Sequence, residues 1–180
     1  VATLTAAGGS AVGLCGLDGN MLQAQRRVVN GKEYGLVGDV IKVDPTVIHN
    51  AIANEYIPVI STVARGVDGE SSYNINADTA ASEIASALKA EKLMFLTDVD
   101  GIRLNAKDSS TLISSISVSE INELISSGVI TGGMIPKVQG CVRAIEQGVK
   151  RVHILDGTIP HPILLEIFTD KGIGPMVHAD

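Results

Sequence analysis

A lysine closely follows a pair of glycines in the segment Thr131-Gly132-Gly133-Met134-Ile135-Pro136-Lys137. This segment is predicted to begin a helix, where exposed backbone N–H groups and the helix dipole make the potential positive. A lysine there is mildly unfavourable unless an anion shares the site. Because Gly132 and Gly133 have no side chains to block close approach, the backbone amides and Lys137 could hold a phosphate together. The simpler alternative is an exposed lysine that happens to fall early in a helix.

A second polar cluster consists of Asn74, Asn76 and Asp78. Asn76 is a good helix N-cap, and Asp78 in the first turn would be stabilised by the helix dipole. Two of the three residues therefore have a structural explanation. Asn74 does not, because the alternation of Tyr73-Asn74-Ile75-Asn76 places it on the same side as Asn76 at the end of a strand. In the functional interpretation, Asn74 hydrogen-bonds a polar substrate while Asp78 orients a nearby lysine.

A third cluster, Thr97-Asp98-Val99-Asp100-Gly101, follows the apolar run Leu93-Met94-Phe95-Leu96, which is typical of a buried parallel strand. Ligands bind beyond the carboxyl ends of such strands, and two carboxylates there could hold a metal or meet a nucleotide's ribose. Asp and Gly are also ordinary turn formers. The sequence contains neither a Walker-type phosphate loop nor the protein-kinase signature set. We interpret the region from Tyr73 to Gly101 as half of a phosphoryl-transfer site.

Strands alternate with helices along the chain, which predicts a three-layer α/β/α sandwich with a mainly parallel sheet, formed by residues 1–180 as a single domain. Strands are expected at residues 11–14, 21–27, 38–43, 57–60, 93–96, 152–155 and 176–177. Helices are expected at residues 1–7, 45–54, 77–88, 117–128, 131–148 and 162–169. A polar loop is expected at residues 65–72.

Composition narrows the classes of partner. The chain of 180 residues is 45% hydrophobic, but it contains no apolar run near the ~20 residues that a membrane helix needs. A formal charge of −6 argues against a nucleic-acid face, and aromatic residues at 3% argue against base stacking. Cys15 and Cys141 lie far apart in sequence and are expected to be reduced, buried thiols of a cytosolic protein, with a disulfide between them as the alternative.

The motifs together resemble the amino acid kinase family over almost the whole chain. The resemblance rests on Gly8-Gly9-x-Ala11-Val12-Gly13-Leu14, Asp18-Gly19, Gly38-Asp39-Val40, Asp44-Pro45, Tyr73-Asn74-Ile75-Asn76-Ala77-Asp78, Thr97-Asp98-Val99-Asp100-Gly101, Gly132-Gly133-Met134-Ile135-Pro136-Lys137 and His161-Pro162-Ile163-Leu164-Leu165-Glu166. The combination of Asn-x-Asn-Ala-Asp with Gly-Gly-Met-Ile-Pro-Lys is specific. Within the family it favours the members that act on N-acetyl-L-glutamate.

The resemblance implies a reaction in which ATP transfers its γ-phosphoryl to the side-chain carboxylate of N-acetyl-L-glutamate, on the route to arginine. Lys137 would stabilise charge on the transferring phosphoryl, Asp78 would position the lysines around it, and Asn74 and Asn76 would bind the substrate. The implied nucleotide contacts are Thr97, Asp98, Gly101, Ile102, Arg103, Thr131, Gly133 and Met134. Mg²⁺ would accompany ATP, held by its phosphates and waters, with no protein metal-ligand set.

The resemblance also bears on regulation and completeness. In arginine-inhibited relatives the effector site uses a Glu and a Gly, which match Glu166 and Gly172. The family's amino-terminal part, with a phosphate-binding lysine and a substrate-binding arginine, is missing here. The chain begins with the predicted end of a helix, as expected for a portion of a larger protein. We therefore expect this portion alone to bind nucleotide but to turn over poorly, and the full-length protein to form a cytoplasmic or plastid-stromal homo-oligomer.

Two alternatives stay open. One is another amino acid kinase (glutamate 5-kinase, aspartokinase or a uridylate kinase-like enzyme), because all share the nucleotide-binding half. The other is a non-catalytic module that senses nucleotide or arginine, which predicts nucleotide binding without product even when the missing half is restored.

Overall fold

The computed structural model describes residues 1–98, 101–105, 108–169 and 172–180. The chain folds into two compact units, Val1–Leu88 and Lys89–Asp180, here called unit 1 and unit 2. Within the described residues, no helix is both long enough and apolar enough to cross a membrane. The secondary structure is mixed α/β with several parallel strand pairs, which agrees with the predicted fold class.

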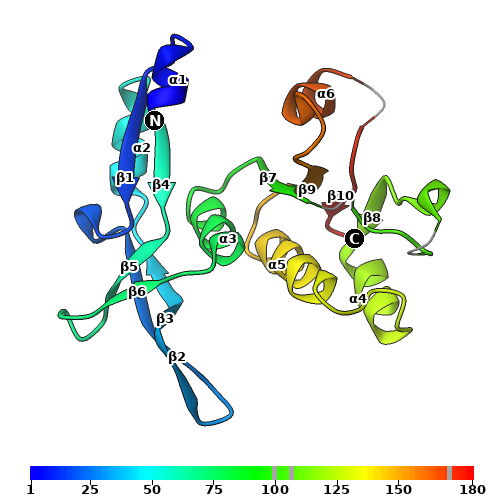
Figure 1. Cartoon of the computed structure of the whole chain (residues 1–180), viewed down its shortest axis with the longest axis horizontal. Helices are drawn as coiled ribbons and strands as arrows, with labels where there is room; N and C mark the ends of the chain where they lie inside the picture. Colours follow the sequence, from blue (N-terminus) through cyan, green and yellow to red (C-terminus); the bar gives the residue numbers. More distant parts are fainter. Residues whose placement is uncertain (99–100, 106–107, 170–171) are drawn as a thin grey trace. The chain divides into compact units, whose positions relative to one another are not determined.

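Unit 1 places a small barrel beside a pair of parallel strands (Figure 1). Its elements are α1 (Ala2–Ala6), β1 (Ala11–Cys15), the 3₁₀ turn η1 (Asp18–Asn20), β2 (Leu22–Val29), β3 (Lys32–Val43), α2 (Thr46–Ala53), β4 (Ile57–Ser61), β5 (Val63–Gly66), β6 (Ser72–Asn74) and α3 (Ala77–Ala87). Strands β1 and β4 pair in parallel, and β2, β3, β6 and β5 close the barrel. The loop expected at 65–72 is wrong at both ends, because Arg65 belongs to β5 and Ser72 to β6. Arg65 lies in β5 because its backbone pairs with Gln23 and Ser72, a long-range contact that its polar side chain does not reveal.

A long antiparallel hairpin, β2–β3, extends from the barrel (Figure 1). Its tip is Asn30-Gly31, and both residues have positive φ, 51° and 74°, as a type I′ turn requires. The sequence analysis expected two shorter strands and no hairpin. The ladder continues to Val29 opposite Lys32, so both strands run further into solvent than their buried parts suggested.

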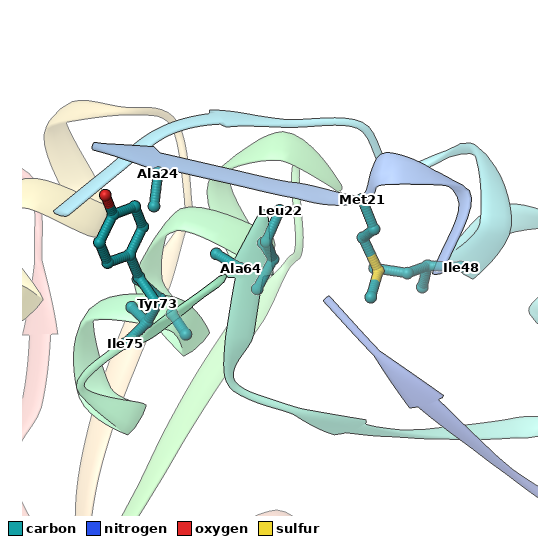
Figure 2. Close-up of a cluster of buried hydrophobic side chains, with 8 residues drawn as sticks. Met21, Leu22, Ala24, Ile48, Ala64, Tyr73 and Ile75 are labelled. Atoms are coloured by element: carbon teal, nitrogen blue, oxygen red, sulfur yellow. The ribbon is translucent and has the colours of Figure 1, made fainter. Parts of the chain in front are cut away.

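The core of unit 1 explains how two asparagines reach the surface. Figure 2 shows a cluster of buried side chains in which Met21 extends toward Ile48 and the ring of Tyr73 lies near Ala24. Tyr73 and Ile75 are buried, whereas Asn74 and Asn76 between and after them are exposed. The predicted alternation is therefore confirmed, and burial of the apolar pair forces the amide side chains outward.

Unit 2 is built on a four-stranded sheet in the order β7-β9-β10-β8. Its elements are β7 (Lys92–Thr97), the 3₁₀ turn η2 (Ser109–Thr111), β8 (Ser115–Ser117), α4 (Val118–Ser126), α5 (Met134–Glu146), β9 (Arg151–Asp156), α6 (Pro162–Phe168) and β10 (Met176–His178). Strands β7 and β9 are parallel, as are β10 and β8, while β9 and β10 are antiparallel. The short strand β8 was not predicted.

The parallel pair β7–β9 fixes where polar residues gather in unit 2. Their register runs from Lys92 opposite Arg151 to Thr97 opposite Asp156. Phe95 is buried in β7, and Ile154 and Leu155 are fully buried in β9. Both strands therefore end their apolar part together, so that the segment after Thr97 and the segment after Asp156 leave the sheet at the same edge.

Candidate functional site

Helix α3 begins with an internal cap. The side-chain oxygen of Asn76 accepts hydrogen bonds from the backbone N–H and the hydroxyl of Thr79, at 3.1 and 3.3 Å. This confirms the prediction that Asn76 is an N-cap. Asp78 lies half-buried in the first turn, where the dipole favours its charge. Asn74 is exposed at the end of β6, and this cap does not involve its side chain.

Helix α5 begins without a capping side chain. Its N-cap residue is Gly133, and no side chain caps the helix. The N–H groups of Met134 and Ile135 reach the carbonyls of Thr131 and Gly132 only at 3.3 Å each, and Pro136 has no N–H to offer. The helix starts at Met134, three residues later than predicted, because Thr131-Gly132-Gly133 forms a turn before it. A Cβ at Gly133 would meet no atom within 4 Å, so the helix start is open to an approaching group.

Lys137 lies in this first part of α5 and turns toward the sheet. Its Nζ is 6.0 Å from the centroid of the Phe95 ring, within the range of a weak cation–π contact. Phe95 is buried in β7 two residues before Thr97, and Lys137 itself is half-buried. The structure thus brings the glycine–lysine segment close to the strand that leads into the third polar cluster. Asp78 belongs to unit 1 and Lys137 to unit 2, so a common pocket for the two stays a prediction.

The end of β7 and the segment after it carry most of the predicted nucleotide contacts. Thr97 is half-buried and Asp98 is exposed, whereas Asp100, the second predicted carboxylate, lies outside the described residues. Gly101 has φ +130°, and a Cβ there would lie 2.3 Å from Cδ of Pro175, so glycine is required on both counts. Ile102 is buried, and Arg103 forms a β-bridge with Leu112. Thr131 and Gly133 are exposed and Met134 is half-buried at the start of α5.

The two predicted effector residues meet in unit 2. A Cβ on Gly172, whose φ is +53°, would lie 3.6 Å from Oε2 of Glu166. The same Oε2 accepts a hydrogen bond from the N–H of Ile173 at 2.9 Å, and Oε1 lies 2.8 Å from Nδ1 of His153. The Glu166 and His153 side chains are 9% and 6% exposed, so this is a buried pair.

His153 is a residue that the sequence analysis missed. Burial lowers its pKa below the ordinary value, and the nearby Glu166 carboxylate opposes that shift. The imidazole is therefore neutral at neutral pH, with its Nδ1–H donating to Glu166. Its Nε2 is buried without a hydrogen-bond partner among the described residues. The available signal was a histidine inside the apolar strand Val152-His153-Ile154-Leu155, since a buried imidazole requires a partner.

A protein-built metal site is not evident. Within the described residues, no group of three or more His, Cys, Asp or Glu side chains is arranged to hold a metal ion. Cys15 and Cys141 are both free thiols, the second fully buried in α5.

The structure is that of an α/β protein in which polar residues follow the carboxyl ends of parallel strands, the edge where ligands bind in sheets of this kind. Residues 1–156 match the Amino acid kinase family. Since this match covers most of the chain, the protein belongs to the amino acid kinase family.

Individual relatives agree with this assignment. The chain is 54% identical to the acetylglutamate kinase of Caldicellulosiruptor saccharolyticus, with 99% of the chain and 61% of the relative covered. It is 55% identical to the acetylglutamate kinase of Prochlorococcus marinus, with 94% of the chain and 55% of the relative covered. The chain therefore spans about three fifths of the length of the curated relatives that it matches.

Solved structures with the same fold include an N-acetylglutamate synthase from Neisseria gonorrhoeae complexed with coenzyme A and N-acetyl-glutamate. It is 28% identical, with a TM-score of 0.86 over 99% of this chain and 40% of the other. The same synthase complexed with coenzyme A and L-arginine is 27% identical over 96% of this chain and 38% of the other, with a TM-score of 0.79. An isopentenyl phosphate kinase from T. acidophilum shares the fold at 19% identity, with a TM-score of 0.61 over 98% of this chain and 63% of the other.

Proposed function

We propose that this chain is the nucleotide-binding part of an enzyme that uses ATP to phosphorylate the side-chain carboxylate of N-acetyl-L-glutamate. The observation that carries the proposal is the open, uncapped start of α5, with Lys137 over Phe95 of β7. A helix start of this kind suits an anion at the edge where β7 ends. The named acetylglutamate kinases at 54% and 55% identity support the choice of acceptor.

The chemistry suits a site without a general base. A carboxylate oxygen of the substrate attacks the γ-phosphorus, the bond from that phosphorus to the β,γ-bridging oxygen breaks, and its electron pair leaves with ADP. A glutamate side chain is already ionised at neutral pH, so no proton has to be removed from the nucleophile. The site must instead stabilise negative charge spread over the transferring phosphoryl. Lys137 and the backbone N–H groups at the start of α5 are the groups proposed for this role.

The nucleotide would lie along the edge formed by two segments of unit 2. Thr97 ends β7 and Asp98, Gly101, Ile102 and Arg103 follow it, and Thr131, Gly133 and Met134 precede or begin α5. Mg²⁺ is proposed to bind with the nucleotide, since oxygen ligands from phosphates and water satisfy its octahedral preference without a cluster of protein carboxylates.

The acceptor substrate is proposed to contact the exposed asparagines of unit 1. Because the side-chain oxygen of Asn76 is already engaged by Thr79, Asn76 can contribute only its NH₂ group as a donor. The exposed side chain of Asn74 offers an oxygen as acceptor and a nitrogen as donor to a substrate that carries an amide and two carboxylates. Asp78 is proposed to orient the lysines around the phosphoryl group.

An acceptor panel on the complete gene product tests this function. ADP release and hydroxylamine trapping of the acyl phosphate are expected with N-acetyl-L-glutamate, and neither is expected with glutamate, aspartate or UMP. Activity on glutamate but not on its N-acetyl derivative would assign the chain to another amino acid kinase. Nucleotide binding with no product from any acceptor would favour a sensing module.

We further propose that arginine regulates the full-length enzyme through Glu166 and Gly172. The buried carboxylate, the side-chain-free Gly172 beside it and the unpartnered Nε2 of His153 form a compact polar group that a guanidinium could join. The related synthase complexed with L-arginine supports the choice of ligand. Glu166→Gln is expected to raise the arginine concentration for half-inhibition at least tenfold without changing uninhibited kcat. Glu146→Gln, at an exposed glutamate, is the control, and a wild-type enzyme that ignores millimolar arginine would refute this part.

The homo-oligomeric state and the cytoplasmic or plastid-stromal location are proposed by analogy with the family. The oligomeric state can be measured by light scattering on the complete gene product. A monomer would contradict the proposed homo-oligomer.

A further inference from the structure

We propose that the turn Asp156-Gly157-Thr158 positions the nucleotide-binding segment by holding the carbonyl of Thr97, which makes Asp156 and Gly157 positioning residues for nucleotide affinity. This inference rests on the proposed function, because it assumes that the segment after Thr97 contacts the nucleotide. It concerns unit 2 alone, and neither residue belongs to the predicted site.

The turn lies directly beside the end of β7. Asp156 is the last residue of β9 and is paired with Thr97, the last residue of β7. One residue further on, the N–H of Gly157 donates to the carbonyl oxygen of Thr97 at 2.7 Å. The final backbone contact of this strand pair therefore comes from the turn, and it fixes the peptide that joins Thr97 to Asp98.

A side chain makes that contact possible. Oδ1 of Asp156 accepts two hydrogen bonds from Thr158, one from its N–H at 2.8 Å and one from its hydroxyl at 2.6 Å. These bonds fold the chain back immediately after the strand, so that the Gly157 N–H faces Thr97. They also lower the pKa of Asp156, so the carboxylate stays ionised and keeps accepting throughout the neutral range.

The absence of a side chain at Gly157 favours the close approach. A Cβ there would lie 3.3 Å from the Thr97 carbonyl oxygen and 3.4 Å from Cβ of Leu96. A methyl group would therefore press on the end of β7 and lengthen the hydrogen bond that holds Thr97. The position is exposed, so burial gives no other reason for a residue without a side chain.

The chain offers a matched control at the start of α2. Asp44-Pro45-Thr46 has the same Asp-x-Thr pattern, and Oδ1 of Asp44 accepts the N–H of Thr46 at 3.0 Å. Hydrogen bonding to Thr46 also lowers the pKa of Asp44. This turn begins helix α2 of unit 1, so removing it should affect stability but leave nucleotide affinity unchanged.

The test uses the complete gene product and four variants: Asp156→Ala, Asp156→Asn, Gly157→Ala and Asp44→Ala. Asp156→Ala and Gly157→Ala are expected to raise the Kd for ADP, measured by calorimetry, and the KM for ATP about five- to tenfold. The kcat and the KM for the acceptor should change less than twofold. Asp156→Asn keeps an acceptor oxygen and should restore nucleotide affinity to within about twofold of wild type, and Asp44→Ala should match wild type.

Several outcomes would overturn the inference. Nucleotide affinity within twofold of wild type in folded Asp156→Ala would do so even if Gly157→Ala failed to fold, as judged by circular dichroism. An equal loss of nucleotide affinity in Asp44→Ala would contradict it as well, because it would show that losing any turn of this kind weakens nucleotide binding. A wild-type enzyme that binds ADP but phosphorylates no acceptor would refute the proposed reaction and leave this inference standing, whereas one that binds no nucleotide would refute both.

Discussion

Helices α3 and α5 both begin beside proposed site residues, but only α3 has a side chain that accepts a hydrogen bond from the N–H groups of its first turn. Helix α3 carries its own cap, Asn76, and an acidic first turn with Asp78. Helix α5 has glycine at the cap, no capping side chain and a lysine where the dipole disfavours one. The first start is satisfied within the chain. The second has no capping side chain at its first N–H groups, an arrangement that suits a phosphate.

The largest effect is expected at the open start. Lys137→Ala in the complete gene product should lower kcat roughly 10²- to 10³-fold, the usual loss when a donor to a charged transition state is removed. The Kd for nucleotide, measured by calorimetry, should change less than threefold, because the charge that Lys137 stabilises develops mainly during transfer. Lys150→Ala, at an exposed lysine of the same unit, is the control. An unchanged kcat in Lys137→Ala would make this an ordinary surface lysine.

A negative charge placed at the N-cap position of α5 should weaken nucleotide binding. Gly133→Asp adds a carboxylate in open space at a permissive backbone conformation, so the fold should tolerate it. Repulsion from the nucleotide phosphates is expected to weaken ADP binding about tenfold at low salt. Gly133→Asn has nearly the same size without the charge and should retain most of the affinity. Equal binding by the two variants would mean that no phosphate approaches this helix start.

At the capped start, loss of a side chain should cost stability. Asn76→Ala is expected to lower the free energy of unfolding by about 1 kcal/mol in urea titrations, the usual value of an N-cap. Asn76→Asp keeps the capping oxygen and should stay near wild type. Asn74→Ala, two residues earlier, should leave stability within about 0.5 kcal/mol and instead raise the KM for N-acetyl-L-glutamate. If Asn76→Ala proves neutral in stability, the contrast between the two helix starts fails.

The smallest expected effect is the influence of the helix dipoles of α3 and α5 on stability. Lys137→Gln removes an unfavourable interaction with the helix dipole and also the weak contact with Phe95, so it should raise the free energy of unfolding by no more than a few tenths of a kcal/mol. Asp78→Asn should lower it by about 0.3–1 kcal/mol. The opposite signs follow from the same positive potential acting on a cation and an anion. Both differences should shrink in high salt, measured by urea titration with and without added NaCl. Changes of the same sign would remove the electrostatic basis of the comparison.

Local signals in the sequence were enough to predict much of the architecture. The parallel strand before Thr97, the cap at Asn76 and the alternation around Tyr73 each depend on neighbours within a few residues, and all three are confirmed. The expected burial of that strand is wrong for most of its residues, because β7 is an edge strand in which Phe95 is buried but Leu96 is 53% exposed. The Asn30-Gly31 dipeptide was an equally local hairpin signal that the sequence analysis did not use. Strands β5 and β8 were out of reach, because backbone pairing with distant segments, such as Met176 opposite Ser115, creates them.

The candidate site was predictable in its residue types but not in its contacts. Lys137 and the glycines were identified from spacing, but the ring of Phe95 beneath the lysine depends on tertiary packing. The bonds from His153 to Glu166 and from Gly157 to Thr97 join segments that only the sheet order brings together. Whether Asp78 and Lys137 act on one phosphate remains a prediction for the kinetic experiments.

The tip of the β2–β3 hairpin has a practical consequence. Asn30 and Gly31 are exposed, a side chain at Gly31 would meet no atom within 4 Å, and the ladder closes just before them at Val29 and Lys32. Exposed turns of this kind tolerate inserted sequence well. An epitope or a dye-binding peptide placed between these two residues should therefore give a reporter for purification or fluorescence that leaves the barrel core undisturbed.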